Sequence, residues 1–298
     1  MKHIPVLTKE VLEYLGPEPN ENFIDCTIGQ AGHAKLILEK TAPSGRLLGI
    51  DLDVQQIENC KTELAGLKNR LVLVNDSYAN LQKTVEKNKF FPVNGILLDM
   101  VFSSWHTDES KKGFSFQEDQ PLDMRYSELS ELTAEKIVNE WSEEKIAKIL
   151  EEYGEEKFAE KIARKITEQR NPPAGGRKIE STFQLAEIVK DATPPAYWRG
   201  RIHYATRTFQ ALRIRVNDEL ENLKKVLPQA VSVLSPRGRF AVISFHSLED
   251  RIVKSFFREQ KKQNNIKILT KKPVTAREEE IKINPRSRSA KLRALIKI

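Results

Sequence analysis

The sequence predicts an α/β fold with a mostly parallel sheet and an inserted all-α domain. Three observations lead to this prediction. Short apolar runs that end on polar residues recur along the chain, as in parallel strands covered on both faces. In the first part of the chain, segments with helical periodicity lie between successive apolar runs. The stretch between the fourth and fifth runs contains only helical patterns and is far longer than an ordinary crossover between two strands.

The first predicted elements surround a glycine-containing turn. Residues 6–15 have the apolar spacing of a short amphipathic helix, which a Gly-Pro pair ends. Residues 23–26 then predict a short buried strand. Gly29 and Gly32 form a tight turn after it, and residues 33–40 open a helix.

The second strand, residues 46–51, completes a unit that is typical of nucleotide binding. It ends on Asp51, which lies 22 residues beyond Gly29. Glycines let the backbone approach a ligand closely, and a carboxylate at this spacing can accept hydrogen bonds from ribose hydroxyls. A Rossmann-like fold is therefore expected, and an ordinary strand–turn–helix unit without a ligand is the alternative. A phosphate-binding P-loop is excluded because its motif is absent from the sequence.

Three further strands are predicted at residues 71–76, 95–99 and 239–245. Ligands of such sheets bind beyond the carboxyl ends of the strands. Four of the predicted strands carry an acidic residue at this end: Asp25, Asp51, Asp76 and Asp99. Each could be a turn or cap residue alone, but together they indicate a site.

The interruption before the fifth strand predicts the domain organisation. Its apolar residues have helical spacing in three segments: residues 133–152, 155–169 and 182–191. A further helix at residues 208–234 leads directly into the fifth strand and is expected to be the returning crossover of the main domain. We therefore expect a discontinuous main domain, 1–104 and 205–298, around a helical insertion, 105–204.

Composition and charge exclude several classes of protein. The 298 residues include 49 Lys and Arg and 42 Asp and Glu, a net charge of +7. No apolar run approaches the ~20 residues that cross a bilayer. The two cysteines are too few for a disulfide framework, so a cytoplasmic location is expected. Residues 251–298 contain 15 basic and 4 acidic side chains, which suggests a polyanionic partner, either nucleic acid or an anionic membrane surface.

Specific motifs in the sequence narrow the choice of function and partner. They stand in this order: His3-x-Pro5-Val6-Leu7, Asp25-x-Thr27-x-Gly29-x-x-Gly32-His33, Gly113-Phe114-Ser115-Phe116, Pro121-Leu122-Asp123-Met124-Arg125, Tyr153-Gly154-Glu155-Glu156, Ala205-Thr206-Arg207-Thr208-Phe209-Gln210-Ala211-Leu212-Arg213-Ile214, Ser244-Phe245-His246-Ser247-Leu248-Glu249-Asp250-Arg251 and Asn284-Pro285-Arg286-x-Arg288-Ser289-Ala290. Over nearly the whole chain, the sequence resembles the MraW family of bacterial S-adenosylmethionine-dependent methyltransferases. That family methylates N4 of a cytidine in 16S ribosomal RNA, near the decoding centre.

The resemblance implies a class I S-adenosylmethionine-dependent methyltransferase fold, with the helical insertion as the substrate-recognition domain and an antiparallel strand at residues 292–298. The cofactor residues it implies are Asp25, Gly29, Ala31, Gly32, His33, Asp51, Tyr78, Asp99 and His106. Among them, residues 31–33 are expected to line the methionine part of the cofactor, Asp51 the ribose and Tyr78 the adenine. The chain departs from the family pattern at Ala31 and Val101, where the family has glycines, and such side chains could crowd the ligand.

Methyl transfer to cytosine N4 needs alignment and an acceptor for the amino proton, because the nitrogen lone pair is delocalised into the ring. Asp99, with Ser103 and Ser104 after it, is the predicted catalytic group. A helix cap or a cofactor contact alone is the alternative role of Asp99. The candidate RNA-binding residues are Lys112, Phe114, Arg125, Arg207 and Arg213.

No metal site is expected. His246, Glu249 and Asp250 could be ligands, but a turn followed by a capping box from Ser247 to Asp250 fits the pattern better. The expected partner is 16S ribosomal RNA within the small ribosomal subunit, without a membrane. The oligomeric state is left open, with a homodimer as one possibility. A non-catalytic ribosome-assembly factor and a DNA or protein methyltransferase are the alternative functions.

Overall fold

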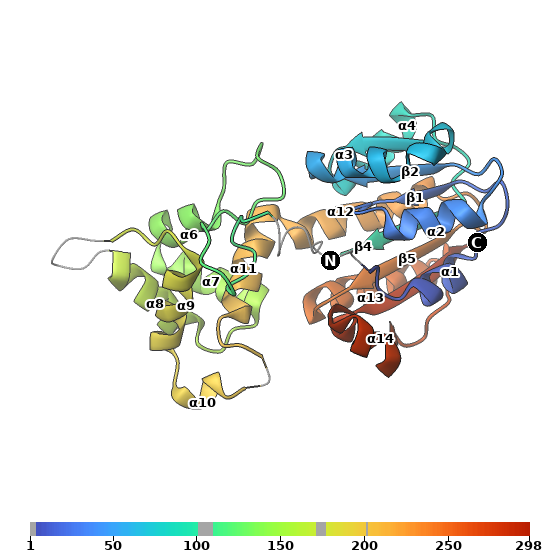
Figure 1. Ribbon diagram of the computed structural model, residues 1–298. Coiled ribbons are helices and arrows are strands. Elements are labelled where there is room, and N and C mark those ends of the chain that lie inside the picture. Colours follow the sequence, from blue (N-terminus) through green and yellow to red (C-terminus); the bar gives the residue numbers. More distant parts are fainter. Residues whose placement is uncertain (1–3, 101–109, 171–176, 201) are drawn as a thin grey trace. The chain divides into compact units, whose positions relative to one another are not determined.

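The computed structural model describes residues 4–100, 110–170, 177–200 and 202–298. The chain divides into two compact units, residues 1–101 with 220–298 and residues 102–219. We call them the sheet unit and the helical unit (Figure 1). In the described part of the chain, no helix is long and apolar enough to cross a membrane.

The sheet unit has the mostly parallel sheet that the sequence predicts. Its strand order is β3-β2-β1-β4-β5-β8-β6, and β7 pairs with β8. The strands are β1 Phe23–Asp25, β2 Leu47–Asp51, β3 Leu71–Asn75, β4 Gly95–Asp99, β5 Arg239–Ser244, β6 Ile266–Ile268, β7 Val274–Thr275 and β8 Lys291–Lys297. β1 to β5 are parallel, whereas β8 runs antiparallel to β5, β6 and β7. The expected antiparallel strand near the end of the sequence is therefore confirmed.

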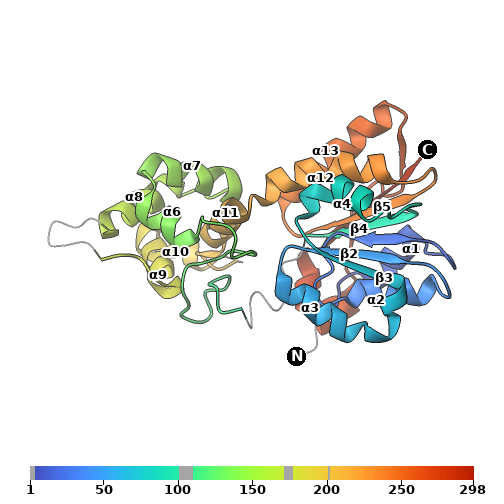
Figure 2. The same cartoon turned by 90° about the horizontal axis from the view of Figure 1, so that it is seen from above.

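Helices cover both faces of this sheet, because alternate residues of each strand point to opposite sides. In β4, Ile96 and Leu98 pack in one apolar cluster and Leu97 in the other. The first cluster includes residues of α4 Leu81–Lys87, α12 Glu219–Val233 and α13 Ser247–Lys262. The second includes residues of α1 Thr8–Leu15, α2 Gly32–Lys40 and α3 Val54–Glu63. Figure 2 shows the two sets of helices on either side of the sheet.

The strand register brings the predicted acids to one edge of the sheet. Asp25 lies beside Leu97 of β4, two residues before Asp99, and Asp51 lies beside Asn75. Asp99 in turn pairs with Ile243 of β5. The carboxyl ends of β1, β2 and β4 therefore carry one acid each at a shared edge.

The helical unit contains α6 Ala134–Glu140, α7 Glu143–Gly154, α8 Ala159–Arg170, α9 Thr182–Ala192, α10 Pro195–Trp198 and α11 Thr206–Asn217. The single helix predicted over residues 133–152 is wrong. Trp141 leaves the helical conformation with ψ 152°, and Ser142 starts α7 by accepting a hydrogen bond from the Lys145 amide.

The long crossover helix predicted over residues 208–234 is also wrong. Asp218 adopts a left-handed conformation, φ 49°, and this ends α11 before α12 begins. Phe209 and Leu212 of α11 lie in the apolar core of the helical unit. The structure therefore assigns α11 to the helical unit, beyond the predicted boundary of the insertion.

Candidate active site

The turn between β1 and α2 is tied to the end of β2. Gly29 has φ 49°, and its amide donates a hydrogen bond of 2.9 Å to Oδ2 of Asp51. Oδ1 of Asp51 accepts another from the Asp53 amide, also 2.9 Å. The Sγ atom of Cys60 in α3 lies 3.0 Å from the Gly29 carbonyl oxygen. The strand, the turn and the next helix thus fix one another at the edge where the acids meet.

Ala31 occupies a position that favours glycine. It caps α2 with φ 62° and ψ 16°, in the left-handed region. Its methyl group is buried and belongs to the apolar cluster beneath α2. The alanine side chain therefore packs inward, and the turn keeps its shape at some conformational cost.

Three titratable side chains are buried together beyond β1 and β4. Asp25, His33 and Asp99 are 2%, 7% and 4% exposed. The Nε2 atom of His33 lies 3.6 Å from Oδ2 of Asp99. Nε2 is buried, and the described part of the chain gives it no hydrogen-bond partner. A buried, unpaired imidazole nitrogen beside carboxylates fits a site that takes a polar or charged ligand.

Thr27 connects the acids of this cluster, a role that sequence reasoning missed. Its amide donates to Oδ1 of Asp25 at 3.1 Å, and its hydroxyl accepts from the Asp99 amide at 2.9 Å. The only signal in the sequence was its place in the Asp25-x-Thr27 motif. A threonine side chain that bridges two strands depends on register, which spacing alone does not reveal.

Burial raises the pKa of Asp25 to about 7. The nearby His33 and the hydrogen bond from the Thr27 amide oppose this rise, and the negative charges of Asp99 and Asp51 add to it. Near neutral pH the carboxyl group is therefore partly protonated, and such strongly shifted groups are common at functional sites.

A cavity of about 600 Å³ lies against the same turn. It is lined by Pro5, Thr8, Ala31, Gly32, Lys35 and Asn59, among others. The lining residues come from α1, α2, α3, the segments before α1 and α2, and the residue after α3, and do not include the strand-end acids. The cavity is thus a hollow beside the turn before α2 that does not reach the strand-end acids, and the acids mark the candidate active site.

The other predicted cofactor and catalytic residues are placed as follows. Tyr78 begins a short helical turn, Tyr78–Asn80, after β3 and packs, partly buried, against the core. Ser103, Ser104 and His106, like Val101, lie outside the described residues.

Two candidate RNA-binding residues are buried inside the helical unit. Phe114 is 7% exposed and stacks on Tyr126, with ring centroids 5.4 Å apart. Arg213 donates two hydrogen bonds, 2.9 and 3.0 Å, to the carboxylate of Glu219. The hydroxyl of Tyr126 donates to the same carboxylate at 2.9 Å. This placement favours a packing role over RNA contact for both residues.

The remaining candidates lie nearer the surface of the helical unit. Lys112 pairs with the exposed Glu128 at 3.4 Å. Arg125 binds Asp123 through two hydrogen bonds of 2.8 Å and so fixes its own loop. Arg207 donates to the Glu155 carbonyl. These three can present positive charge to a phosphate backbone.

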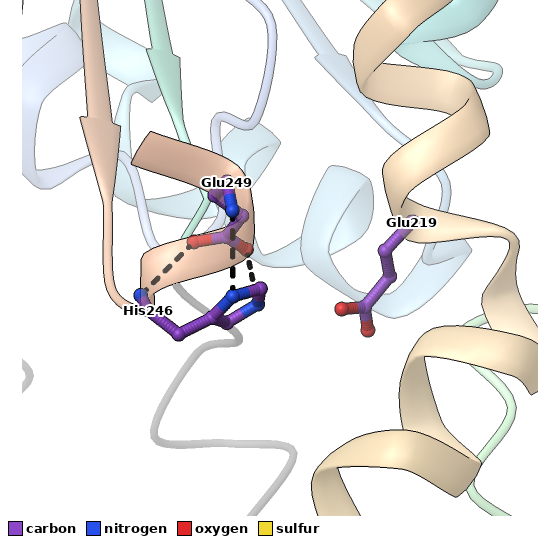
Figure 3. Close-up of side chains that lie close together, drawn as sticks. All are labelled: Glu219, His246 and Glu249. Carbon is purple, nitrogen blue, oxygen red and sulfur yellow. Dashed lines mark hydrogen bonds and ion pairs between the residues drawn. The ribbon is translucent and has the colours of Figure 1, made fainter. Parts of the chain in front are cut away.

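The motif after β5 forms a capping box, but not the one expected from Ser247 to Asp250. His246 is the N-cap of α13, and the box joins it to Glu249. The His246 Nε2 and Glu249 Oε1 atoms are 3.1 Å apart, as Figure 3 shows at the start of the helix. The expectation fails because the helix begins one residue earlier. Asp250 instead accepts hydrogen bonds of 2.7 and 3.1 Å from Arg293 of β8.

Residues 1–298 match the model of the MraW methylase family. The chain belongs to this family. Full-length relatives agree with the match. The chain is 44% identical to a protein of Syntrophotalea carbinolica, over 99% of this chain and 97% of that protein. The identity is 45% to a protein of Heliobacterium mobile, over 99% of both chains, and 48% to one of Thermotoga neapolitana, over 98% and 95%. All three carry the name ribosomal RNA small subunit methyltransferase H.

Membership of the MraW methylase family confirms that the chain is a methyltransferase that depends on S-adenosylmethionine. The predicted fold class is confirmed as well, because the sheet is mostly parallel, ends in an antiparallel strand and is interrupted by a helical unit.

Proposed function

We propose that this chain transfers the methyl group of S-adenosylmethionine to N4 of a cytidine in 16S ribosomal RNA of the small ribosomal subunit, near the decoding centre, in the cytoplasm. The family and the names of its relatives support the ribosomal RNA class of substrate. The observation that carries the chemistry is the buried pair of His33 and Asp99 at the carboxyl end of β4.

The residues of the turn fit the methyl donor. When bound, S-adenosylmethionine would supply a sulfonium-bound methyl group for in-line transfer, with a neutral thioether as the leaving group. Asp51 would accept the ribose hydroxyls, since a carboxylate has several acceptor positions besides those used by the Gly29 and Asp53 amides. The turn at residues 29–33 would hold the methionine part. The inward packing of the Ala31 methyl group favours an intact donor site over a degenerate one.

Asp99 is the proposed acceptor for the amino group of the base. A carboxylate that accepts a hydrogen bond from N4 concentrates the nitrogen lone pair and can take the proton released on methylation. The buried surroundings strengthen this interaction because water is excluded. His33, 3.6 Å away, can share that proton through its unpaired Nε2.

Lys112, Arg125 and Arg207 are the proposed phosphate contacts of the helical unit. Contacts of this kind supply affinity and position the strand rather than read its sequence. They make the helical unit the proposed substrate-recognition domain.

The decisive experiment incubates the protein with labelled S-adenosylmethionine and small ribosomal subunits that lack the modification. Label in a single cytidine of 16S ribosomal RNA, on N4, is the expected result. Protein, DNA and subunits that already carry the methyl group serve as control substrates. Label confined to protein or DNA, or an absence of label in the RNA, would contradict the proposal.

A further inference from the structure

Two motifs that the proposed chemistry leaves unused meet in the sheet unit. The Leu7 amide donates a hydrogen bond of 2.7 Å to Oε1 of Glu280. The side-chain amide of Asn284 donates one of 2.9 Å to the Ile4 carbonyl oxygen. Glu280 lies in α14 Glu278–Ile283, and Asn284 is the C-cap of that helix. These two hydrogen bonds join residues that are 273 and 280 positions apart in the sequence.

The segment held by these contacts has a strained conformation. Leu7 has φ 53° and ψ 34°, in the left-handed region, although its side chain is fully buried. It is the N-cap of α1 and forms no side-chain cap hydrogen bond. Such a conformation persists where the surrounding contacts impose it. The Glu280 carboxylate supplies one such contact, and it places negative charge at the N-terminus of α1, where the helix dipole favours it.

Pro5, in the segment of residues 4–7, packs against the turn before α2. A Cβ atom added to Gly32 would lie 2.8 Å from Cγ of Pro5 and 3.1 Å from its Cβ, so the proline ring packs directly on the Gly32 backbone. Gly32 is the first residue of α2 and follows the left-handed Ala31. The turn is therefore confined from two sides, by Asp51 at Gly29 and by Pro5 at Gly32.

A third contact between the same segments is too weak to account for this arrangement. Nε of Arg277 lies 3.9 Å from Oε1 of Glu10, near the limit for an ion pair, and although Glu10 is buried the arginine side chain is 77% exposed. Exposed ion pairs contribute little to stability. Asn284, by contrast, is 8% exposed, so its hydrogen bond is largely shielded from water.

We propose that Glu280 and Asn284 are positioning residues for the methyl donor. They hold residues 4–7 so that Pro5 confines Gly32 and the turn before it, without touching the donor themselves. The proposal rests on donor binding at this turn, which is part of the proposed function, and is independent of which RNA is methylated.

The test measures S-adenosylhomocysteine binding by calorimetry and donor kinetics in Glu280→Ala and Asn284→Ala. Each variant loses one hydrogen bond that holds residues 4–7 in place. We therefore expect the dissociation constant of S-adenosylhomocysteine and the donor KM to rise about five- to tenfold, with kcat at saturating donor unchanged. Glu280→Gln keeps the oxygen that accepts from Leu7 and should bind nearly as the wild type does. Glu279→Ala, an exposed acid of the same helix, is the matched control.

Pro5→Ala separates positioning from general stability because it leaves both hydrogen bonds of the C-terminal segment intact. It should weaken donor binding to a similar degree, and Pro5→Ala with Glu280→Ala should cost less than the sum of the two single changes. Hydrogen exchange in the donor-free protein should quicken at the amides of residues 32–35 while those of β2 stay protected.

Unchanged donor affinity in Pro5→Ala would overturn the proposal even if Glu280→Ala fails to fold. If Glu280→Ala folds, additive effects in the double variant would overturn it as well. Either result leaves the RNA methylation proposal standing. Conversely, if the variants behave as expected but the wild type labels no ribosomal RNA, the proposed substrate fails and the positioning role remains.

Discussion

The amide of Gly29 and Oδ2 of Asp51 are joined by a 2.9 Å hydrogen bond, so the residue proposed to bind ribose also shapes the turn proposed to bind methionine. Replacing Asp51 should therefore weaken donor binding in two ways. Asp51→Ala loses both backbone hydrogen bonds, and Asp51→Asn loses one of them, because an amide has a single acceptor oxygen. We expect the donor dissociation constant to rise about 100-fold in the first and about tenfold in the second. Calorimetry checks this order, with Glu58→Ala on the exposed side of α3 as control.

Asp99→Asn should separate catalysis from folding. The change keeps the shape of the side chain and removes its ability to take a proton, so methyl transfer should slow by about 10²- to 10⁴-fold. Donor affinity should fall far less. Single-turnover transfer to small subunits gives the rate and calorimetry gives the affinity. A variant that transfers methyl groups at the wild-type rate would show that Asp99 is only a cap or a cofactor contact.

Asp25→Asn should change how stability depends on pH. The pKa of Asp25 is about 7 in the folded protein, against 3.8 for an ordinary aspartate. Between these two pH values the folded state therefore keeps a proton that the unfolded state has lost. The free energy of unfolding of the wild type should therefore fall as the pH rises from about 4 to about 7. Above about pH 7 it should stay constant, lowered by the full cost of burying the charged carboxylate. The asparagine variant avoids this cost, which is at most about 4 kcal/mol.

Thermal unfolding of the donor-free protein at several pH values tests this prediction. The melting temperature of Asp25→Asn relative to wild type should increase between about pH 5 and about pH 7 and then level off. Asp119→Asn, at an exposed carboxylate, should show no such trend. A constant difference across the range would mean that Asp25 is ionised throughout.

Arg213 and Lys112 should respond differently to alanine substitution. Arg213→Ala leaves the buried Glu219 carboxylate without its cationic partner and should cost about 3–5 kcal/mol of stability. Lys112→Ala breaks an ion pair with an exposed acid and should cost less than about 1 kcal/mol. Lys112→Ala should also weaken RNA binding and reduce the dependence of the binding constant on salt concentration by the amount expected for about one phosphate contact. Chemical denaturation and binding at two salt concentrations separate the two roles. A stable Arg213→Ala with weakened RNA binding would restore its assignment as an RNA contact.

The five parallel strands, with the acids at the ends of β1, β2 and β4, were predictable from sequence because burial on both faces demands continuous apolar runs. The short strands β6 and β7 were not predicted. β4, Gly95–Asp99, has the predicted bounds, and β5 differs from its prediction at one end. The breaks in the helical unit were not predictable from periodicity. At Ser142 and Asp218, a cap or one left-handed residue interrupts an apolar pattern that continues beyond it.

The placement of the acids at the strand ends was predictable from sequence, but the contacts of their side chains were not. The bridge from Thr27 to Asp99 depends on the register of two strands, and the contact of Leu7 with Glu280 joins distant segments. No local spacing encodes either. For the same reason, Arg213 and Phe114 had the chemistry of RNA-binding residues, and only packing shows that they are buried.

The neighbouring strands β4 and β5 are separated in the sequence by the helical unit, and this has a consequence for folding kinetics. The order β3-β2-β1 joins segments that are close in the chain, so these pairings can form early. The pairing of Asp99 with Ile243 must instead close a loop that contains the whole helical unit, and the entropy of closing it is lost before any contact compensates. Nascent chains should therefore form the edge proposed to bind ribose before the proposed catalytic carboxylate, Asp99, reaches its final neighbours.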